Sequence, residues 1–455
     1  MASASGALAC LPSKVVGGQP DFPAGFKWGV ASAAAQVESR QGRGRSNWDV
    51  FADQKGHIAD GSTNAINTEF ESRYPEDLAM LGSAGVNAFR FSFAWPRIQP
   101  NGPGKPSEAG LALYDRMIDE MLRQGMEPAA TMFHWDMPIW AGDFRDRAAA
   151  RRLADYADIL TRRFGDRIPL WLALNEPNSV AAAGYAFGMH APGLASAEAA
   201  GAAVHHQNLA QGLMLAAARA NLPKGAKAST TINLQPVRPL TESRDDAQAA
   251  QMADAFWNRA WLDPLFGRGY PERVLPLVEP FIRSGDMAVI AVRPEFIGMN
   301  YYARVYAQAQ AKSPLGFMPK VDGFSDKFIR TQMLPVEPDG LTEMLMRIHT
   351  EYGAPDIYVT ETGFPLDDPR PVDGIVRDPK RIAYLKSYLQ AAHRAIEQGA
   401  RLRGLYYWSA TDNWEWALGF AKTFGLIQVD RATQQRTPKA SLAYYAQCIK
   451  LNGIA

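Results

Sequence analysis

Cysteine is nearly absent from this sequence. Only Cys10 and Cys448 occur among the 455 residues, one near each end, and neither belongs to a CxxC pair or to a cluster with histidine. Structural zinc sites and dithiol redox centres need such clusters, so both are excluded, and we expect no metal and no cofactor. The two thiols leave two alternatives, a Cys10–Cys448 disulfide that joins the ends of the fold or two free thiols.

Excess charge and long hydrophobic runs are also missing. The 48 basic and 47 acidic side chains give a formal net charge of +1, so nothing favours nucleic acid or another polyanion as a partner. No run of about eighteen apolar residues occurs, which argues against a membrane span. The triplet Ala7-Leu8-Ala9 is like a signal-peptidase site, but no basic start precedes it. We therefore expect a soluble protein, cytoplasmic or periplasmic, of undetermined oligomeric state.

Two short apolar runs each lead into a glutamate. The first, PLWLALN at 169–175, precedes Glu176, and the second, PDIYVT at 355–360, precedes Glu361. Each run predicts a strand that is buried on both faces and stops at its glutamate. In a barrel of parallel strands, functional groups lie at the strand C-terminal ends, where two carboxylates brought together can hydrolyse a glycoside. A single glutamate at a strand end is more often solvated or ion-paired, so neighbouring motifs must decide.

Strand-like and helix-like stretches alternate along most of the chain, which predicts a single α/β domain, a (β/α)8 TIM barrel, rather than an open sheet. We expect residues 1–20 to form a lead-in, residues 21–455 to form the catalytic domain, and residues 307–332 to form a long loop over the pocket. The predicted strands span 26–36, 88–95, 128–135, 169–175, 226–234, 295–302, 355–360 and 402–409. The predicted helices between them span 68–81, 111–124, 148–164, 196–220, 245–258, 341–352 and 379–398.

Eight motifs follow one another in a fixed order. They are FKWGVAS at 26–32, FRFSFAWPRI at 89–98, FHWDMP at 133–138, LNEP at 174–177, GMHAPG at 188–193, GMNYY at 298–302, VTETG at 359–363 and WSATDNWEW at 408–416. With these motifs the chain strongly resembles glycoside hydrolase family 1, the β-glucosidase family, from about residue 21 to residue 446. The resemblance implies a (β/α)8 barrel and a retaining mechanism, with Glu176 as general acid/base and Glu361 as nucleophile.

The resemblance also implies the residues around the two glutamates. Arg90 and Tyr302 match the family residues that contact the nucleophile. Sugar binding is expected from side chains that match the family's glycone site, with Trp408 as an apolar floor. These side chains are Gln36, His134, Asn175, Trp408, Glu415 and Trp416. Trp135 and Phe424 are either pocket residues or packing residues, and His205 and His206 are interpreted as surface or packing residues that point to different sides of a helix.

Two positions narrow the expected substrate. Relatives that act on 6-phosphosugars carry a smaller neutral residue in place of Glu415, so an anionic Glu415 should repel such a phosphate, and Lys422 alone does not argue for one. Glu176 is retained where the thioglucosidase branch has glutamine, which favours O-glycosides. Asn178 stands where the family commonly has Trp, and Thr362 stands where it usually has Asn. These two differences leave the leaving-group preference and the fine positioning of the site open.

The leading hypothesis is a retaining β-glucosidase that hydrolyses non-phosphorylated β-O-glucosides from the non-reducing end. Its partner would be a small-molecule β-glucoside or oligosaccharide, with no nucleic acid and no membrane. One alternative is a transglycosidase that uses the same residues. The other is a non-catalytic glycan-binding protein.

Overall fold

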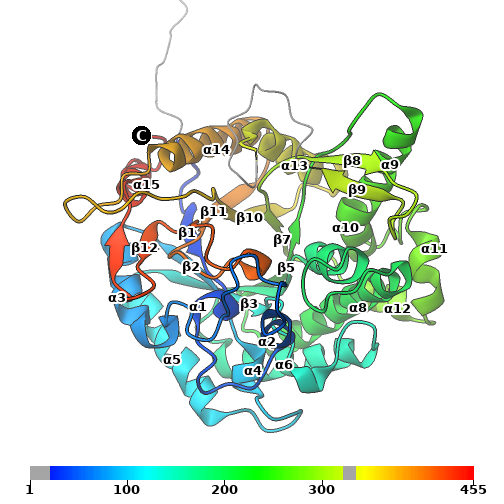
Figure 1. Ribbon diagram of the computed structural model, residues 1–455, viewed down its shortest axis with the longest axis horizontal. Coiled ribbons are helices and arrows are strands. Elements are labelled where there is room, and N and C mark those ends of the chain that lie inside the picture. The colour runs from blue at the N-terminus through cyan, green and yellow to red at the C-terminus, as the bar shows by residue number, and fades with distance from the viewer. Residues whose placement is uncertain (1–20, 321–334) are drawn as a thin grey trace, which may run out of the picture.

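The computed structural model describes residues 21–320 and 335–455, and its centre is a closed barrel of eight parallel strands (Figure 1). The strands follow the order β1-β11-β10-β7-β5-β4-β3-β2, and β1 closes the ring by pairing with both β2 and β11. Their bounds are β1 Lys27–Ala31, β2 Ala88–Ser92, β3 Glu127–Phe133, β4 Leu170–Asn175, β5 Lys227–Asn233, β7 Phe296–Asn300, β10 Asp356–Thr362 and β11 Leu402–Trp408. The predicted (β/α)8 barrel is confirmed.

A ring of helices covers the outside of the barrel (Figure 1). The larger ones are α3 Phe70–Ser83, α5 Glu108–Arg123, α6 Ala148–Phe164, α8 Ala197–Asn221, α9 Arg244–Asp254, α13 Pro338–Glu351, α14 Pro379–Glu397 and α15 Ala440–Leu451. The strands are buried on both faces, as in β4, where all six residues are buried, because their outer faces pack against these helices. The main hydrophobic core therefore lies between the strands and the helices.

Short elements connect the strands and helices. The helical ones are α1 Ala34–Val37, α2 Asn47–Ala52, α4 Trp95–Ile98, η1 Ile139–Ala141, α7 Pro177–Ser179, η2 Val180–Ala186, η3 Ala255–Arg259, α10 Ala260–Leu265, α11 Leu275–Val278, η4 Glu279–Phe281, α12 Asp286–Ile290 and η5 Trp416–Leu418. Two short strands, β12 Ile427–Val429 and β13 Arg436–Pro438, form a separate antiparallel pair.

The predicted first strand, 26–36, is too long. The strand β1 ends at Ala31, and Gln36 lies in the short helix α1. The turn between them is fixed because the Ala34 backbone N–H donates to Ser92 Oγ at 2.8 Å, which attaches the chain to the end of β2. The run Ala33-Ala34-Ala35 has a higher propensity for helix than for strand, and this local preference prevails once the barrel register ends.

The predicted helix 245–258 is also interrupted. Regular α-helix stops at Asp254, and the π-helix η3 and the helix α10 continue the chain. A second π-helix, η2, follows the strand end at Glu176. Each π-turn inserts an extra residue into the helical hydrogen-bond ladder, and such turns are frequent at functional sites.

The predicted loop 307–332 was wrong over its first part. Strands β8 Val305–Ala309 and β9 Phe317–Lys320 form an antiparallel hairpin, and β8 also pairs in parallel with β6 Val237–Pro239. Figure 1 shows this small sheet beside α9, at the rim of the barrel. Residues 321–334 of the predicted loop lie outside the described residues.

The two ends of the described chain meet. Asp21 forms a β-bridge with Gly453, and the Phe22 backbone N–H donates to the Asn452 carbonyl at 2.9 Å. Cys448 is buried in α15, whereas Cys10 and the rest of the predicted lead-in, residues 1–20, lie outside the described residues. Over 21–320 and 335–455 no helix has both the length and the apolar character that a membrane crossing needs.

Candidate active site

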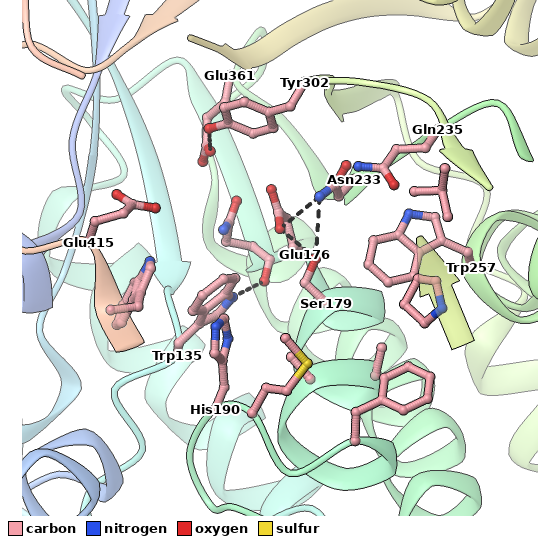
Figure 2. Close-up of a pocket in the computed structure, with 18 of the residues that line it drawn as sticks. Trp135, Glu176, Ser179, His190, Asn233, Gln235, Trp257, Tyr302, Glu361 and Glu415 are labelled. Carbon is pink, nitrogen blue, oxygen red and sulfur yellow. Dashed lines mark hydrogen bonds between the residues drawn. The ribbon is translucent and has the colours of Figure 1, made fainter. Parts of the chain in front are cut away.

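A pocket of about 290 Å³ opens among the loops that follow the barrel strands. Its wall includes both glutamates singled out in the sequence, Glu176 after β4 and Glu361 near the end of β10 (Figure 2). Seven further expected residues line the pocket, and Arg90 bonds Glu361 without lining it. The seven are Gln36, His134, Asn175, Tyr302, Trp408, Glu415 and Trp416.

Glu361 is surrounded by donors suited to an anion. The Arg90 guanidinium donates from Nη1 to Glu361 Oε1 at 2.5 Å, and the Tyr302 hydroxyl donates to Oε2 at 2.7 Å. Arg90 is itself buried and donates from Nε to Thr131 Oγ1 at 3.0 Å. Each carboxylate oxygen therefore has a charged or polar donor as its partner.

Glu176 lies in different surroundings. Its backbone has φ 44° and ψ 59°, a left-handed conformation that turns the chain out of β4 into α7. Burial, and next the negative charge of Glu361, raise the pKa of Glu176 to about 7. Three neutral donors partly oppose this shift: Ser179 Oγ at 2.6 Å and Asn233 Nδ2 at 3.2 Å from Oε2, and Asn300 Nδ2 at 2.7 Å from Oε1.

The side chain of Asn175 connects the surroundings of the two glutamates. Its Oδ1 accepts from Arg90 Nη2 at 2.7 Å and from Asn300 Nδ2 at 3.1 Å. Since Asn300 also donates to Glu176, one continuous network runs from the partner of Glu361 to Glu176. This network holds the two carboxylates in fixed relative positions.

His134 completes the network on the other side of Asn175. Asn175 Nδ2 donates to His134 Nε2 at 2.9 Å, and burial together with the nearby Arg90 charge lowers the pKa of His134 well below its usual range. The ring is therefore neutral with its proton on Nδ1. Among the described residues Nδ1 has no hydrogen-bond partner, so one buried donor of this ring is unpaired.

Gln36 and Glu415 form a second polar pair. Gln36 Nε2 donates to Glu415 Oε2 at 3.1 Å, and Gln36 Oε1 has no partner within the described part of the chain. Burial, and then the charge of Glu361, raise the pKa of Glu415 to about 8. Since the raised pKa favours the neutral carboxyl near neutral pH, the expected repulsion of a phosphate by an anionic Glu415 stays a prediction. Lys422 does not line the pocket and pairs with Asp367 at 3.2 Å.

Aromatic rings form the floor beneath these polar groups. The His134 ring stacks between Trp408 and Trp416, with centroid distances of 5.9 and 5.8 Å. Trp135 packs against Trp416 at 4.5 Å and donates from Nε1 to the Asn175 carbonyl at 2.9 Å. Flat apolar surfaces beside hydrogen-bonding groups suit a pyranose ring, which has C–H faces and hydroxyl edges.

Several residues that line the pocket or bond Glu176 were missed in the sequence. Asn233 and Asn300 end strands β5 and β7, so the strand-end rule that selected the glutamates would also have found them. Trp257 and Gln235 lie outside the recognised motifs and gave no such signal. Trp135 and Phe424, left open between two interpretations, both line the pocket.

The histidine pair His205 and His206 is buried, so the surface alternative was wrong and the packing alternative holds. His205 bonds Asp286 at 2.9 Å, and His206 bonds the Phe144 carbonyl at 2.8 Å. Across the described ranges, no group of three or more His, Cys, Asp or Glu side chains is arranged to hold a metal ion.

Comparison with known proteins gives one consistent result. The model of the family Glycosyl hydrolase family 1 matches residues 19–454. The chain is 35% identical to Beta-glucosidase A of Thermotoga maritima, covering 95% of this chain and 98% of that one. It is 37% identical to a bifunctional β-D-glucosidase/β-D-fucosidase of Bifidobacterium breve, covering 94% and 98%.

Solved structures agree with this result. The family 1 β-glucosidase from Thermotoga maritima superposes with a TM-score of 0.90 at 34% identity, covering 96% of this chain and all of that one, and it has also been solved in complex with deoxynojirimycin. The resemblance seen in the motifs is thus confirmed over nearly the whole length. The chain belongs to glycosyl hydrolase family 1, whose members are retaining β-glycosidases.

Proposed function

We propose that this family 1 hydrolase is a β-glucosidase that removes glucose from the non-reducing end of non-phosphorylated β-O-glucosides. The observation that carries the proposal is the contrast between the two pocket glutamates. Glu361 accepts hydrogen bonds from a cation and a hydroxyl, whereas burial and a nearby negative charge raise the pKa of Glu176 to about 7. A nucleophile works ionised and a general acid works protonated, so Glu361 is assigned as nucleophile and Glu176 as acid/base.

The reaction proceeds in two steps. Glu361 attacks the anomeric carbon while Glu176 gives its proton to the glycosidic oxygen, so the leaving alcohol departs and an ester links the sugar to Glu361. In the second step Glu176 takes a proton from water, the water oxygen attacks the same carbon, and the ester bond to Glu361 breaks. Retention follows because the carbon is inverted twice.

The electrostatics explain how Glu176 changes role between the steps. The Glu361 charge contributes to the raised pKa of Glu176, second only to burial. When Glu361 becomes an ester this charge disappears, so the pKa of Glu176 falls and the group becomes a base at the pH where it was an acid.

The remaining assigned residues hold the glucose. Gln36, His134, Asn175 and Glu415 offer donors and acceptors on one side of the carboxylate pair, and Trp408 and Trp416 supply the aromatic floor. Two of these groups, Gln36 Oε1 and His134 Nδ1, have no hydrogen-bond partner inside the described ranges. A sugar hydroxyl that binds them removes the cost of leaving them unpaired, which is the basis of strong hydroxyl recognition.

Both alternatives to hydrolysis are less well supported. The relatives described above are hydrolases by name, which favours water over an alcohol as the acceptor. A glycan-binding protein needs neither acid nor nucleophile, yet both carboxylates and their partners are present. We assign residues 21–455 as the catalytic domain, supported by the family match, and a small-molecule β-glucoside or oligosaccharide as its partner.

Three variants test the assignment with 4-nitrophenyl β-glucoside as substrate. Glu361→Ala should lose nearly all turnover, and Glu176→Ala should mainly slow the second step, because this leaving group needs little protonation. Glu397→Ala, at an exposed position in α14, is the matched control and should behave as wild type. Equal rates for all three would refute the assignment.

Azide separates the two roles. In Glu361→Ala the small anion takes the place of the missing nucleophile, attacks carbon one once, and yields the α-glucosyl azide. In Glu176→Ala azide attacks the ester on Glu361 without needing a base and yields the β-azide. Reversed stereochemistry would mean that the two assignments must be exchanged.

A further inference from the structure

The pocket has a second half that the glucose site does not use. In Figure 2 Glu415 lies on one side of Glu176, and Gln235 and Trp257 lie on the other. The wall on this other side combines the loop after η2, the π-helix η3 and the sheet β6-β8-β9, with the side chains of Phe187, Met189, Val305, Phe317 and Pro319. Apart from Glu176, Glu361 and Glu415, no Asp, Glu, Lys or Arg of the described chain lines the pocket.

The two halves differ in their polar groups. The glucose side presents four polar side chains over an aromatic floor, whereas the outer side presents mostly apolar surface. Its polar features, apart from the groups that bond Glu176, are the Trp257 indole, the Gln235 amide and the His190 imidazole in the loop after η2. Trp257 Nε1 and Gln235 Oε1 are both buried, and neither has a hydrogen-bond partner within 21–320 and 335–455. One donor and one acceptor are thus held unpaired in an apolar wall.

Both groups are held from behind. Asn178 Nδ2 donates to the Trp257 carbonyl at 3.1 Å, and Asn258 binds both backbone groups of Gln235, accepting from its N–H at 3.1 Å and donating to its carbonyl at 2.9 Å. The rings of Phe187 and Phe317 meet edge to face at 6.1 Å and connect the loop after η2 to the small sheet. The outer wall is therefore preorganised.

From this contrast we infer that the leaving-group site takes an uncharged alcohol with an apolar alkyl or aromatic body that carries at most one hydroxyl besides the one in the glycosidic bond, rather than a second glucose. A second glucose has hydroxyls on every edge. Most of these hydroxyls would lose their hydrogen bonds to water and would gain few hydrogen bonds from the apolar wall. An apolar body gains from the same wall, and one further hydroxyl, which is both donor and acceptor, can pair with Trp257 Nε1 or with Gln235 Oε1. This inference rests on the proposed β-glucosidase activity.

The first test compares hexyl β-glucoside with cellobiose by the glucose released from wild-type protein. Glucose is the more acidic leaving alcohol, so chemistry alone favours cellobiose. We expect kcat/KM to favour hexyl β-glucoside by about tenfold or more. A preference for cellobiose would overturn the inference and leave the proposed function intact, whereas no turnover even of 4-nitrophenyl β-glucoside would refute the proposed function itself.

The second test changes the wall. Phe187→Ser and Phe317→Ser should lower kcat/KM for hexyl β-glucoside by about tenfold, mainly through KM, and should alter methyl β-glucoside little because its methyl group is too short to reach the wall. Val372→Ser, at an exposed apolar position outside the pocket, is the control. Equal losses for both glucosides would mean a general structural effect and would overturn the inference.

The third test concerns the one further hydroxyl. The substrates are 2-phenylethyl β-glucoside and its 4-hydroxyphenyl analogue, which leave as primary alcohols of the same kind. Wild type should prefer the hydroxylated substrate, and Trp257→Phe, which keeps a ring but removes the N–H, should reduce this preference by about fivefold. An unchanged preference in the variant would overturn the role given to Trp257.

Discussion

Asn178 fastens the backbone of Asn233 through two hydrogen bonds. Its Nδ2 donates to the Asn233 carbonyl at 2.6 Å, and its Oδ1 accepts from the Asn233 N–H at 3.3 Å. Asn233 in turn donates from its side chain to Glu176, so a residue outside the pocket wall controls one of the three donors on the assigned acid. Asn178, which stands where tryptophan is common in the family, is therefore a buried residue that positions Asn233.

Replacing Asn178 should therefore affect both stability and acid–base behaviour. Asn178→Leu leaves buried backbone groups unpaired, and we expect a loss of about 1–3 kcal/mol in the free energy of unfolding. It also loosens Asn233, and since that donor lowers the pKa of Glu176, the alkaline limb of kcat/KM should move to higher pH. Thermal unfolding and a pH profile measure the two effects.

Asn208→Leu is the matched control for this prediction. Asn208 is also a buried asparagine, and its Nδ2 donates to the carbonyls of Val204 and Ala260, away from the pocket. It should lower the unfolding temperature without moving the pH profile. If both variants left the alkaline limb in place, the positioning task of Asn178 would be refuted.

The wild-type pH profile should fall on its alkaline side near pH 7. Glu176 must be protonated to act as acid, and its pKa in the free protein is about 7. Ser179→Ala removes the 2.6 Å donor to Glu176 Oε2, which stabilises the ionised form, so the limb should shift upward. The measurement is the pH dependence of kcat/KM for an alkyl β-glucoside. If the alkaline limb of this profile moved to lower pH in Ser179→Ala, the assignment of the limb to Glu176 would be contradicted.

The Tyr302 hydroxyl should matter more for rate than for folding. Tyr302→Phe keeps the ring and removes the 2.7 Å donor to Glu361 Oε2, so one oxygen of the assigned nucleophile loses its fixed partner. We expect kcat to fall by about 100-fold while the unfolding temperature changes little. The control is Tyr74→Phe on α3, a partly buried position remote from the pocket, and comparable kinetics for the two variants would contradict the prediction.

Protein stability should depend on the ionisation of Glu415. Its pKa is about 8 in the folded protein against 4.5 for an unperturbed glutamate, so the unfolded chain ionises first as pH rises. The contribution of the neutral carboxyl to stability is complete below about pH 4.5 and is lost progressively up to about pH 8. Glu415→Gln cannot ionise, so it should raise the unfolding temperature relative to wild type more at pH 8 than at pH 5.

Scanning calorimetry at the two pH values measures this difference. We expect the gain at pH 8 to exceed the gain at pH 5 by roughly 2–4 °C. The control Glu397→Gln changes an exposed carboxyl and should show no such difference. An equal gain at both pH values would contradict a neutral Glu415 in the folded protein.

The barrel and its two glutamates were predictable because they depend on local pattern. The runs that end at Glu176 and Glu361 are short and apolar, and these features follow directly from burial on both faces. The end of the first strand was misplaced for the opposite reason. Alanine is compatible with either structure, so the apolar pattern of 26–36 did not reveal that Gln36 had entered a helix.

The outer wall was beyond sequence reasoning because it depends on pairing between distant segments. The strand β8 pairs with β6, about seventy residues earlier, and β6 has three residues, too few to signal a strand alone. The raised pKa of Glu415 was equally hidden, since its burial and its proximity to the Glu361 charge exist only in the folded chain. The outer wall and the ionisation of Glu415 both depend on contacts between distant segments, which composition does not reveal.

Closure of the barrel sets a condition on biosynthesis. Gln36 bonds Glu415, which lies 379 residues later, and Arg90 bonds Glu361, 271 residues later. While the ribosome is still translating α15, the nascent polypeptide already contains every assigned group, but β1 still lacks the hydrogen bond that the Tyr445 hydroxyl of α15 donates to the Gly29 carbonyl. Appearance of glucosidase activity during synthesis should therefore report completion of the whole ring rather than of any fragment.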